Sequence, residues 1–235
     1  MLKILALGNS FSTDCTAHLE KMTSSAYVRN LYIGGCSLER HANNLDNKIA
    51  DYSLQKDGIG LSDVNVTANE IIASEAWDII TVQQVSGLSG LYESHYPYLT
   101  TVLEHIRTLC PTAKIVWNRT WAYATYSTHG EFPKYDRDQS KMNAMIDEVS
   151  HRVASENGLD LIEVGKVIQA LREHLPPDGT ELCRDGFHLS LDYGRYAAAY
   201  VWAKFFHLSV GDYLPDGADA ERIAEIRRIC DTYVE

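Results

Sequence analysis

Near its start the chain has the sequence Lys3-Ile4-Leu5-Ala6-Leu7-Gly8-Asn9-Ser10-Phe11-Ser12, in which an apolar run leads into a glycine and a polar turn. A short apolar run ended by a turn is typical of a strand that is covered on both faces of a sheet. In open α/β sheets ligands bind beyond the carboxyl ends of the strands, so a serine just after such a strand lies in the ligand crevice. We therefore expect a strand at Lys3–Leu7 and take Ser10 as a candidate functional residue. A plain helix-capping role for Ser10 or Ser12 is the alternative.

Four further apolar runs alternate with helical patterns along the rest of the chain. Their Ile, Leu and Val content favours parallel strands, and the alternation favours helices on both faces of one sheet. The sequence therefore predicts an α/β protein with three α/β/α layers and a five-stranded parallel sheet. The further strands are expected at Tyr27–Ile33, Asp78–Gln83, Lys114–Trp117 and Leu159–Val164. Helices are expected at Thr16–Ser25, Tyr98–Cys110, Asp138–Asn157, Leu191–Leu208 and Asp219–Val234, and loop-rich segments at Ser37–Val66 and Ala122–Arg137.

The composition is that of an ordinary globular protein, with 45% hydrophobic and 23% charged residues. The 21 basic and 32 acidic residues give a net charge of −11, which argues against general binding to a nucleic-acid backbone. No run approaches the ~20 apolar residues that a membrane span requires. The first apolar run also lacks the cleavage site of a signal peptide. We expect a cytoplasmic protein without nucleic-acid or membrane partners, although a secreted protein whose leader had been removed would look the same.

The cysteines and histidines show no metal-binding pattern. The five cysteines are spread widely and form no C-x-x-C pair, which favours buried free thiols over disulfides or a zinc site. Histidines such as His95, His129 and His207 have no H-E-x-x-H or similar spacing. The first strand is not followed by G-x-G-x-x-G or by a P-loop lysine. The sequence therefore predicts neither a metal nor another cofactor.

A second candidate motif, Asp185-Gly186-Phe187-His188, lies shortly before the last two predicted helices. An aspartate and a histidine three residues apart can share one turn, so that the carboxylate orients an imidazole that takes a proton from a serine. An isolated Asp-x-x-His is usually a surface loop, but together with Ser10 it predicts a Ser-His-Asp site. Because Ser10 and His188 lie far apart in the chain, one sheet must bring them together. This favours a single domain over residues 1–235.

With these motifs the sequence resembles the SGNH/GDSL hydrolase superfamily over nearly its whole length. Members of that superfamily have a flavodoxin-like α/β/α fold and are esterases, lipases, thioesterases and carbohydrate deacetylases. The resemblance implies Ser10 as the nucleophile, His188 as the general base and Asp185 as the residue that orients the ring. Asn9 stands where the family usually has an aspartate, a change that keeps the hydrogen bonding of the turn.

The resemblance also implies an oxyanion hole, the set of donors that holds the negative oxygen of a tetrahedral intermediate. Gly34-Gly35-Cys36-Ser37 resembles the second family block and implies that Ser10 and Gly35 donate backbone N–H groups. The third block departs from the family, because the chain has Val82-Gln83-Gln84-Val85 where an asparagine donor is usual. Gln83 or Gln84 could supply this amide, and Gln83 aligns slightly better with glutamine-containing motifs of some sugar-acetyl esterases. Only one of them can face the site, since neighbouring strand residues point to opposite sides.

The function implied by the resemblance is that of a serine esterase that forms and then hydrolyses an acyl-enzyme. A small ester is the expected partner, with an acetylated carbohydrate as the expected substrate class. Candidate pocket residues follow the second and fourth predicted strands; they are Arg40, His41, Trp121 and Tyr123. A non-catalytic flavodoxin-like binding module and a lipase or thioesterase of the same fold are the alternatives. The sequence defines neither the acyl-chain length nor the oligomeric state.

Overall fold

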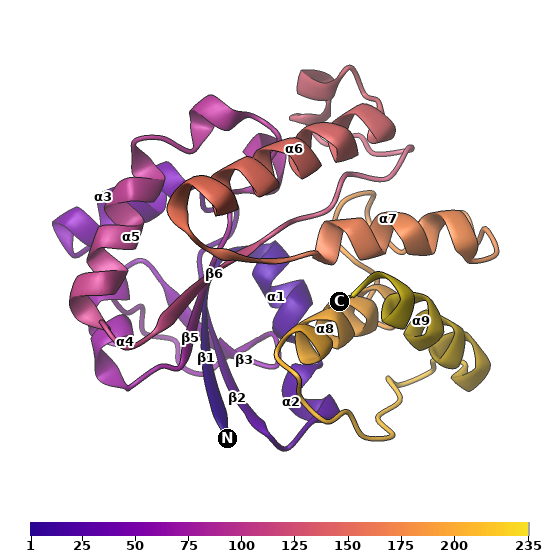
Figure 1. The fold of residues 1–235 in the computed structure, drawn as a ribbon, viewed down its shortest axis with the longest axis horizontal. Coiled ribbons are helices and arrows are strands. Elements are labelled where there is room, and N and C mark those ends of the chain that lie inside the picture. Colours follow the sequence, from indigo (N-terminus) through magenta and orange to yellow (C-terminus); the bar gives the residue numbers. More distant parts are fainter. Residues whose placement is uncertain (235) are drawn as a thin grey trace.

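The computed structural model describes residues 1–234, and its seven strands form one sheet in the order β4-β3-β2-β1-β5-β6-β7 (Figure 1). β1 lies in the middle and pairs in parallel with β2 on one side and β5 on the other. β6 and β7 extend the parallel part of the sheet beyond β5. The strands are β1 (Leu2–Gly8), β2 (Ala26–Tyr32), β3 (Ser53–Lys56), β4 (Ile59–Gly60), β5 (Ile79–Val82), β6 (Lys114–Asn118) and β7 (Asp160–Ile162).

The five predicted strands are confirmed as β1, β2, β5, β6 and β7, with ends that differ by at most two residues. The sheet has seven strands rather than five, because the segment expected to be loop-rich adds the antiparallel hairpin β3–β4 at one edge. These two strands are short and have no apolar run. Asp57 and Gly58 join them with φ angles of 52° and 78°. Strands this short at a sheet edge do not produce the apolar run of a buried parallel strand, so the sequence does not predict them.

Helices cover both faces of the sheet (Figure 1). α1, α2, α7, α8 and α9 pack on one face, α3, α4 and α5 pack on the other, and α6 contributes buried residues to both cores. None of the helices among residues 1–234 is long and apolar enough to cross a membrane. The helices are α1 (Ser10–Thr16), α2 (Leu19–Met22), α3 (Leu38–Asn47), α4 (Ala68–Ser74), α5 (Tyr98–Leu109), α6 (Gln139–Asn157), α7 (Val164–His174), α8 (Tyr193–Phe205) and α9 (Ala220–Tyr233). Short 3-10 turns lie at Ser86–Leu88, Tyr92–Ser94 and Phe132–Tyr135.

The predicted helices are confirmed for α5, α6, α8 and α9, whereas the helix predicted at Thr16–Ser25 is misplaced. α1 instead begins at Ser10, directly after β1, and the shorter α2 follows it. The side chain of Asn9 accepts a hydrogen bond from the Phe11 N–H and so caps α1. The polar turn predicted at this point is therefore the first turn of a helix. α3, α4 and α7 lie outside the predicted helices.

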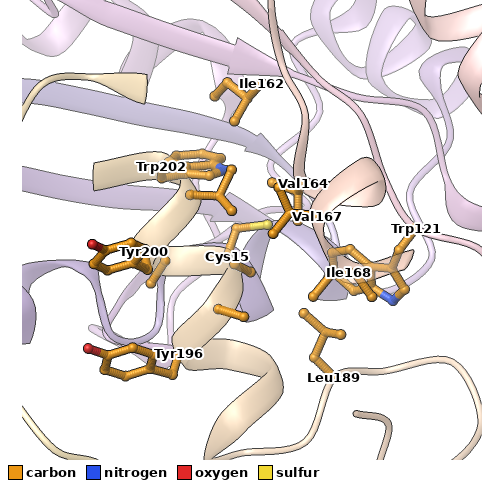
Figure 2. Packing of buried hydrophobic residues seen from close by; sticks show 14 of the residues in the cluster. Cys15, Trp121, Ile162, Val164, Val167, Ile168, Leu189, Tyr196, Tyr200 and Trp202 are labelled. Atoms are coloured by element: carbon orange, nitrogen blue, oxygen red, sulfur yellow. The ribbon is translucent and has the colours of Figure 1, made fainter. Parts of the chain in front are cut away.

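The core on the α8 side combines small and large residues (Figure 2). Residues 197–199 of α8 are three consecutive buried alanines, which let α8 pack closely. Trp202 is fully buried in the same cluster as Cys15 and Val167. Its indole N–H donates to Asn118 Oδ1 at the end of β6, at 3.0 Å. Trp202 therefore fills the space between α1 and the sheet and has a partner for its one polar atom.

All five cysteines are buried and free, as the sequence predicts. Burial raises the pKa of the Cys36 thiol to about 12 and raises the pKa values of Cys15, Cys183 and Cys230 as well. A thiol reacts as its thiolate, so burial disfavours the reactive form of these groups.

Two fully buried histidines make the stability of the fold depend on pH. His41 and His95 each have an Nε2 atom without a hydrogen-bond partner among the described residues. Burial, together with the charge of Arg40, lowers the pKa of His41 to about 3, and burial lowers the pKa of His95 to about 4. Both rings are therefore neutral in the folded protein at pH 5, whereas in an unfolded chain they titrate near pH ~6.5.

We predict that the free energy of unfolding decreases as the pH falls from 7 to 5, by about 2 kcal/mol for each of these histidines. The unfolded chain takes up protons over this range and the folded chain does not, so acid favours unfolding. Urea unfolding at the two pH values measures the change, and His95→Gln should remove roughly half of it. An equal free energy of unfolding at both pH values would contradict this account of the two rings.

Candidate active site

Ser10 lies where the central strand passes directly into a helix. Asn9 makes this connection, because its Oδ1 accepts from the Phe11 N–H at 3.0 Å and its Nδ2 donates to the Cys36 carbonyl at 3.0 Å. Asn9 is buried, whereas Ser10 is partly exposed at the carboxyl edge of the sheet. The amide thus supplies the hydrogen bonding of the turn and presents the next side chain to the crevice where α/β proteins bind ligands.

Asp185 and His188 lie on a tight hairpin that precedes α8. The Arg184 N–H donates to the His188 carbonyl at 3.0 Å and closes this turn. At its tip Gly186 has a φ of 85°, and a Cβ there would lie 3.0 Å from the Ser127 Cα. Both the left-handed backbone and the close neighbour require glycine, which explains the second residue of the Asp-Gly-Phe-His motif.

The hairpin brings His188 to Ser10, which is 178 positions away in the chain. Ser10 Oγ lies 2.8 Å from His188 Nε2, and His188 Nδ1 lies 2.6 Å from Asp185 Oδ2. The other oxygen of Asp185 accepts from the His188 N–H at 2.8 Å and from the Phe187 N–H at 3.2 Å. An ionised carboxylate only accepts, so it fixes a proton on Nδ1 and leaves Nε2 to accept from the serine hydroxyl.

The charge of Asp185 is stabilised by its neighbours. Partial burial raises the pKa of the Asp185 carboxyl. Hydrogen bonds from the His188 ring and from the backbone N–H groups of the turn lower this pKa by more, so it lies below its usual range. The carboxylate is therefore ionised at neutral pH and can stabilise a positive imidazolium beside it.

A cavity of about 580 Å³ opens over Ser10 and His188. Gly34 and Gly35, from the turn after β2, and residues 85–88, which follow β5, also line it. The cavity therefore lies at the ends of parallel strands, between the nucleophile candidate and two neighbouring turns, which is the position expected for a ligand site in such a sheet.

Another part of the cavity wall comes from the loop between β6 and α6, where His129, Glu131 and Lys134 line it. His129 Nδ1 accepts from the Glu131 N–H at 3.1 Å, and burial lowers the pKa of the ring, so its neutral form carries the proton on Nε2. Glu131 and Lys134 form an ion pair. The sequence analysis missed these three residues, because nothing in a polar loop indicates which side chains turn inward.

The backbone N–H groups of Ser10 and Gly35 are free at the cavity. Ser10 and Gly35 both line it, and within residues 1–234 neither of their N–H groups donates to a hydrogen-bond acceptor. Gly35 has a φ of 62°, a backbone conformation that favours glycine. Free N–H groups beside a nucleophile candidate are the donors that an oxyanion hole needs.

Gln83 does not line the cavity, because its amide belongs to a buried chain of hydrogen bonds, here called the amide chain. Its Nε2 donates to Asn9 Oδ1 at 3.1 Å, and its Oε1 accepts from Asn118 Nδ2 at 2.8 Å. Asn118 in turn accepts from the indole of Trp202. The amide chain therefore links β5 to the residue that precedes Ser10, to β6 and to α8.

Gln84 is also buried and outside the cavity. Its Oε1 accepts from the N–H groups of Leu38 and Val85, at 3.0 and 2.8 Å, and its Nε2 donates to the Ser94 carbonyl at 2.9 Å. The expectation that Gln83 or Gln84 completes the oxyanion hole is thus not met by their positions. Both amides are used by backbone and side-chain partners that secure the turns around the site.

The aromatic pocket candidates lie in the core instead of the cavity wall. Trp121 is fully buried, stacks on Phe11 with ring centroids 4.1 Å apart, and donates its indole N–H to the Phe187 carbonyl at 2.8 Å. Tyr123 is also fully buried, and its hydroxyl lies 3.0 Å from Ser86 Oγ. Trp121 contacts Phe11 and Tyr123 contacts Ser86, and both of these partners line the cavity. The two rings therefore pack behind the residues of the cavity wall.

The two polar pocket candidates, Arg40 and His41, also lie outside the cavity. Arg40 is exposed on α3 and pairs with Asp51 at 2.6 Å. His41 is buried, and its Nδ1 lies 2.9 Å from the Tyr52 hydroxyl. Their partners, Asp51 and Tyr52, lie in the segment between α3 and β3.

Among residues 1–234 a single group of side chains has the spacing of a metal site, formed by Asp147, His151 and Glu163. Arg119 already occupies its centre, because its buried guanidinium bonds Glu163 at 2.8 Å and also pairs with Asp147. A cation of the chain itself therefore compensates these carboxylates. This group is not part of the cavity wall.

Comparison with known families and structures shows which proteins the chain resembles. A family model described as domain of unknown function (DUF4886) matches residues 3–230. The structure of a DUF4886 family protein from Bacteroides uniformis is 34% identical, with a TM-score of 0.87 over 99% of this chain and 94% of that chain. No curated protein matches the chain in sequence.

Two further structures share the fold at lower identity. A protein from Slackia heliotrinireducens, classed with the SGNH hydrolases, is 23% identical with a TM-score of 0.62, over 86% of this chain and 97% of that chain. An acetylxylan esterase from Geobacillus stearothermophilus, solved as a catalytic mutant, is 13% identical with a TM-score of 0.51, over 86% and 93% of the two chains. The fold is that of the SGNH/GDSL hydrolases, as the motifs imply.

We predict that Gln84→Leu lowers the free energy of unfolding by about 2 to 4 kcal/mol, because it leaves several buried backbone groups without a partner. Asn47→Leu is the control, since its exposed amide bonds only Asn43 of the same helix. We expect it to change the free energy of unfolding by less than about 0.5 kcal/mol. Urea unfolding measures both variants, and equally small effects would contradict the structural role of Gln84.

Proposed function

We propose that this chain, which belongs to the DUF4886 family and has the SGNH/GDSL hydrolase fold, is a serine hydrolase of small carboxylic esters. One observation carries the proposal, namely the line of contacts from Ser10 Oγ to His188 Nε2 at 2.8 Å and from His188 Nδ1 to Asp185 Oδ2 at 2.6 Å. A nucleophile, its base and the residue that orients the base need such distances. The contacts lie in the wall of a cavity of about 580 Å³, which gives a substrate room to bind.

In the first half of the proposed reaction Ser10 Oγ bonds to the ester carbonyl carbon while its proton passes to His188 Nε2. The carbonyl oxygen becomes negative and is held by the free N–H groups of Ser10 and Gly35. Asp185 stabilises the imidazolium from the other side of the ring. The bond from the carbonyl carbon to the alcohol oxygen then breaks, and His188 gives its proton to that oxygen. The alcohol leaves, and the acyl group stays on Ser10.

In the second half a water molecule attacks the acyl carbon while His188 Nε2 takes one of its protons. The same two N–H groups hold the second tetrahedral intermediate. When the bond to Ser10 Oγ breaks, His188 returns a proton to that oxygen. A carboxylic acid leaves, and the serine hydroxyl is restored.

For the substrate we propose an acetylated carbohydrate. The cavity is far larger than an acetyl group, and it combines apolar side chains such as Phe187 with polar ones such as Ser37 and His129. A mixed wall of this kind suits a hydroxyl-rich alcohol next to a small acyl group. The likeness in fold to an acetylxylan esterase supports the same class.

Two alternatives make different demands on the site. A non-catalytic binding module needs no contact between Ser10 and His188, so the 2.8 Å separation favours catalysis over it. A lipase or thioesterase would use the same three residues and differ in its acyl chain, so substrate preference separates it from an acetylesterase.

We predict that Ser10→Ala abolishes labelling by a fluorophosphonate probe and lowers kcat for a short-chain aryl ester by roughly 10³-fold or more. Ser12→Ala is the matched control, because that hydroxyl is buried and outside the cavity, where it lies 2.7 Å from both Asn30 Oδ1 and the Asn9 carbonyl, so its loss disturbs the same turn without removing the nucleophile. It should still be labelled at Ser10. Hydrolysis that persists in Ser10→Ala would exclude Ser10 as the nucleophile.

We also predict that kcat/KM is highest for acetyl esters and decreases as the acyl chain lengthens, with acetylated sugars turned over faster than aryl acetates. The measurement is a panel of acetylated sugars and aryl esters of increasing chain length, with Ser10→Ala as the blank. Rates that rise with chain length would favour a lipase or thioesterase. The absence of both turnover and labelling would favour the binding module.

A further inference from the structure

Asp14 is a fully buried carboxylate on α1, one helical turn after Ser10, and the proposed reaction does not use it. Its Oδ1 accepts from Arg195 Nε at 2.8 Å, and its Oδ2 accepts from the Leu189 N–H at 2.9 Å. Arg184 Nη1 lies 3.1 and 3.2 Å from the two oxygens. Two arginines and a backbone N–H therefore stabilise the buried charge of Asp14, which needs such partners inside the protein.

Two of these donors flank the hairpin that carries Asp185 and His188. Arg184 immediately precedes Asp185, and Leu189 immediately follows His188, so Asp14 holds both ends of the turn. Arg184 Nη1 also donates to the Leu189 carbonyl, which joins the two ends to each other. One buried side chain thus ties the base of this hairpin to α1.

Helix geometry places Asp14, with its contacts to the hairpin, next to the nucleophile. Ser10 and Asp14 are four residues apart in α1 and so lie on the same side of the helix. Any movement of the hairpin away from α1 must stretch the contacts of Asp14 and the contact between Ser10 and His188 together. Arg195 brings the start of α8 to the same carboxylate, which fixes the hairpin from its other end.

We propose that Asp14 is a positioning residue that sets the separation of Ser10 Oγ and His188 Nε2. The inference rests on the proposed function, since it assigns Asp14 a role in that reaction. A carboxylate is required because three donors converge on its two oxygens. An asparagine would offer one accepting oxygen and turn an NH₂ group toward donors that cannot accept from it.

The test compares Asp14→Asn with the wild-type enzyme on a short-chain aryl ester, at a temperature where circular dichroism shows both to be folded. We expect kcat to fall roughly 10- to 100-fold, because a displaced base transfers the proton less efficiently. KM should change little, because Asp14 lies outside the cavity. The rate of fluorophosphonate labelling should fall in parallel with kcat.

Thr13→Val is the matched control for lost stability. Thr13 is the neighbouring residue of α1, is buried, and bonds Gln55 at 2.8 Å and Asn30 at 2.9 Å, on the side of β2 and β3 and away from the hairpin. Its substitution removes buried hydrogen bonds from the same helix and leaves the Asp14 contacts in place. We expect a lower Tm with kcat unchanged.

Two further measurements separate positioning from loss of structure. The proton between His188 Nδ1 and Asp185 gives a low-field NMR signal, which should shift or broaden in Asp14→Asn and stay in Thr13→Val. In a double-mutant cycle, Asp14→Asn is combined with Arg184→Gln. The double variant should lose less kcat than the product of the two single losses, because both substitutions remove the same contact between Asp14 and Arg184.

Equal kcat in Asp14→Asn and Thr13→Val would overturn the proposal, and so would an unmoved His188 signal in Asp14→Asn. The failure of the proposed function has a different signature, in which the wild-type protein itself neither hydrolyses esters nor is labelled. The NMR comparison does not depend on turnover, so in that case too it tests whether Asp14 positions His188.

Discussion

The amide chain from Asn9 through Gln83 and Asn118 to Trp202 is the interaction on which the arrangement of the site depends. It joins the ends of three parallel strands to α8 in the interior of the protein. A buried amide without its partner costs about 1 to 3 kcal/mol, so each member restrains its neighbour to one orientation. Because Asn9 also caps α1, the direction of the Ser10 side chain is set by contacts in the core and not by the cavity itself.

β1, β5 and β6 could be predicted from the sequence because they are largely buried on both faces and therefore consist mainly of apolar residues. The same holds for α5, whose apolar stripe faces a single core. The hairpin β3–β4 left no such pattern, since its strands are very short and contain no apolar run. The start of α1 was missed for a different reason. Gly8 and Asn9 suggest a loop, yet the asparagine side chain caps a helix that begins at once.

Within the site, the residues that belong to short motifs could be nominated from the sequence, and the structure brings Ser10, Asp185 and His188 within hydrogen-bond distance. The wall of the cavity could not be nominated in the same way. Trp121 is buried behind the wall, where its ring stacks on Phe11, while His129 lines the cavity and packs against Phe187. Such choices depend on tertiary packing, which residue type alone does not encode.

The separation of 178 positions between Ser10 and His188 has a consequence for the order in which the protein is made. A ribosome adds about 5 to 20 residues per second, so the histidine is synthesised roughly 10 to 35 seconds after the serine. The central strand and the serine turn can pair with β2 and β5 during that interval, but the hairpin and α8 do not yet exist. The serine turn therefore precedes its base in synthesis, and the contact between Ser10 and His188 can form only once the last quarter of the chain docks onto α1.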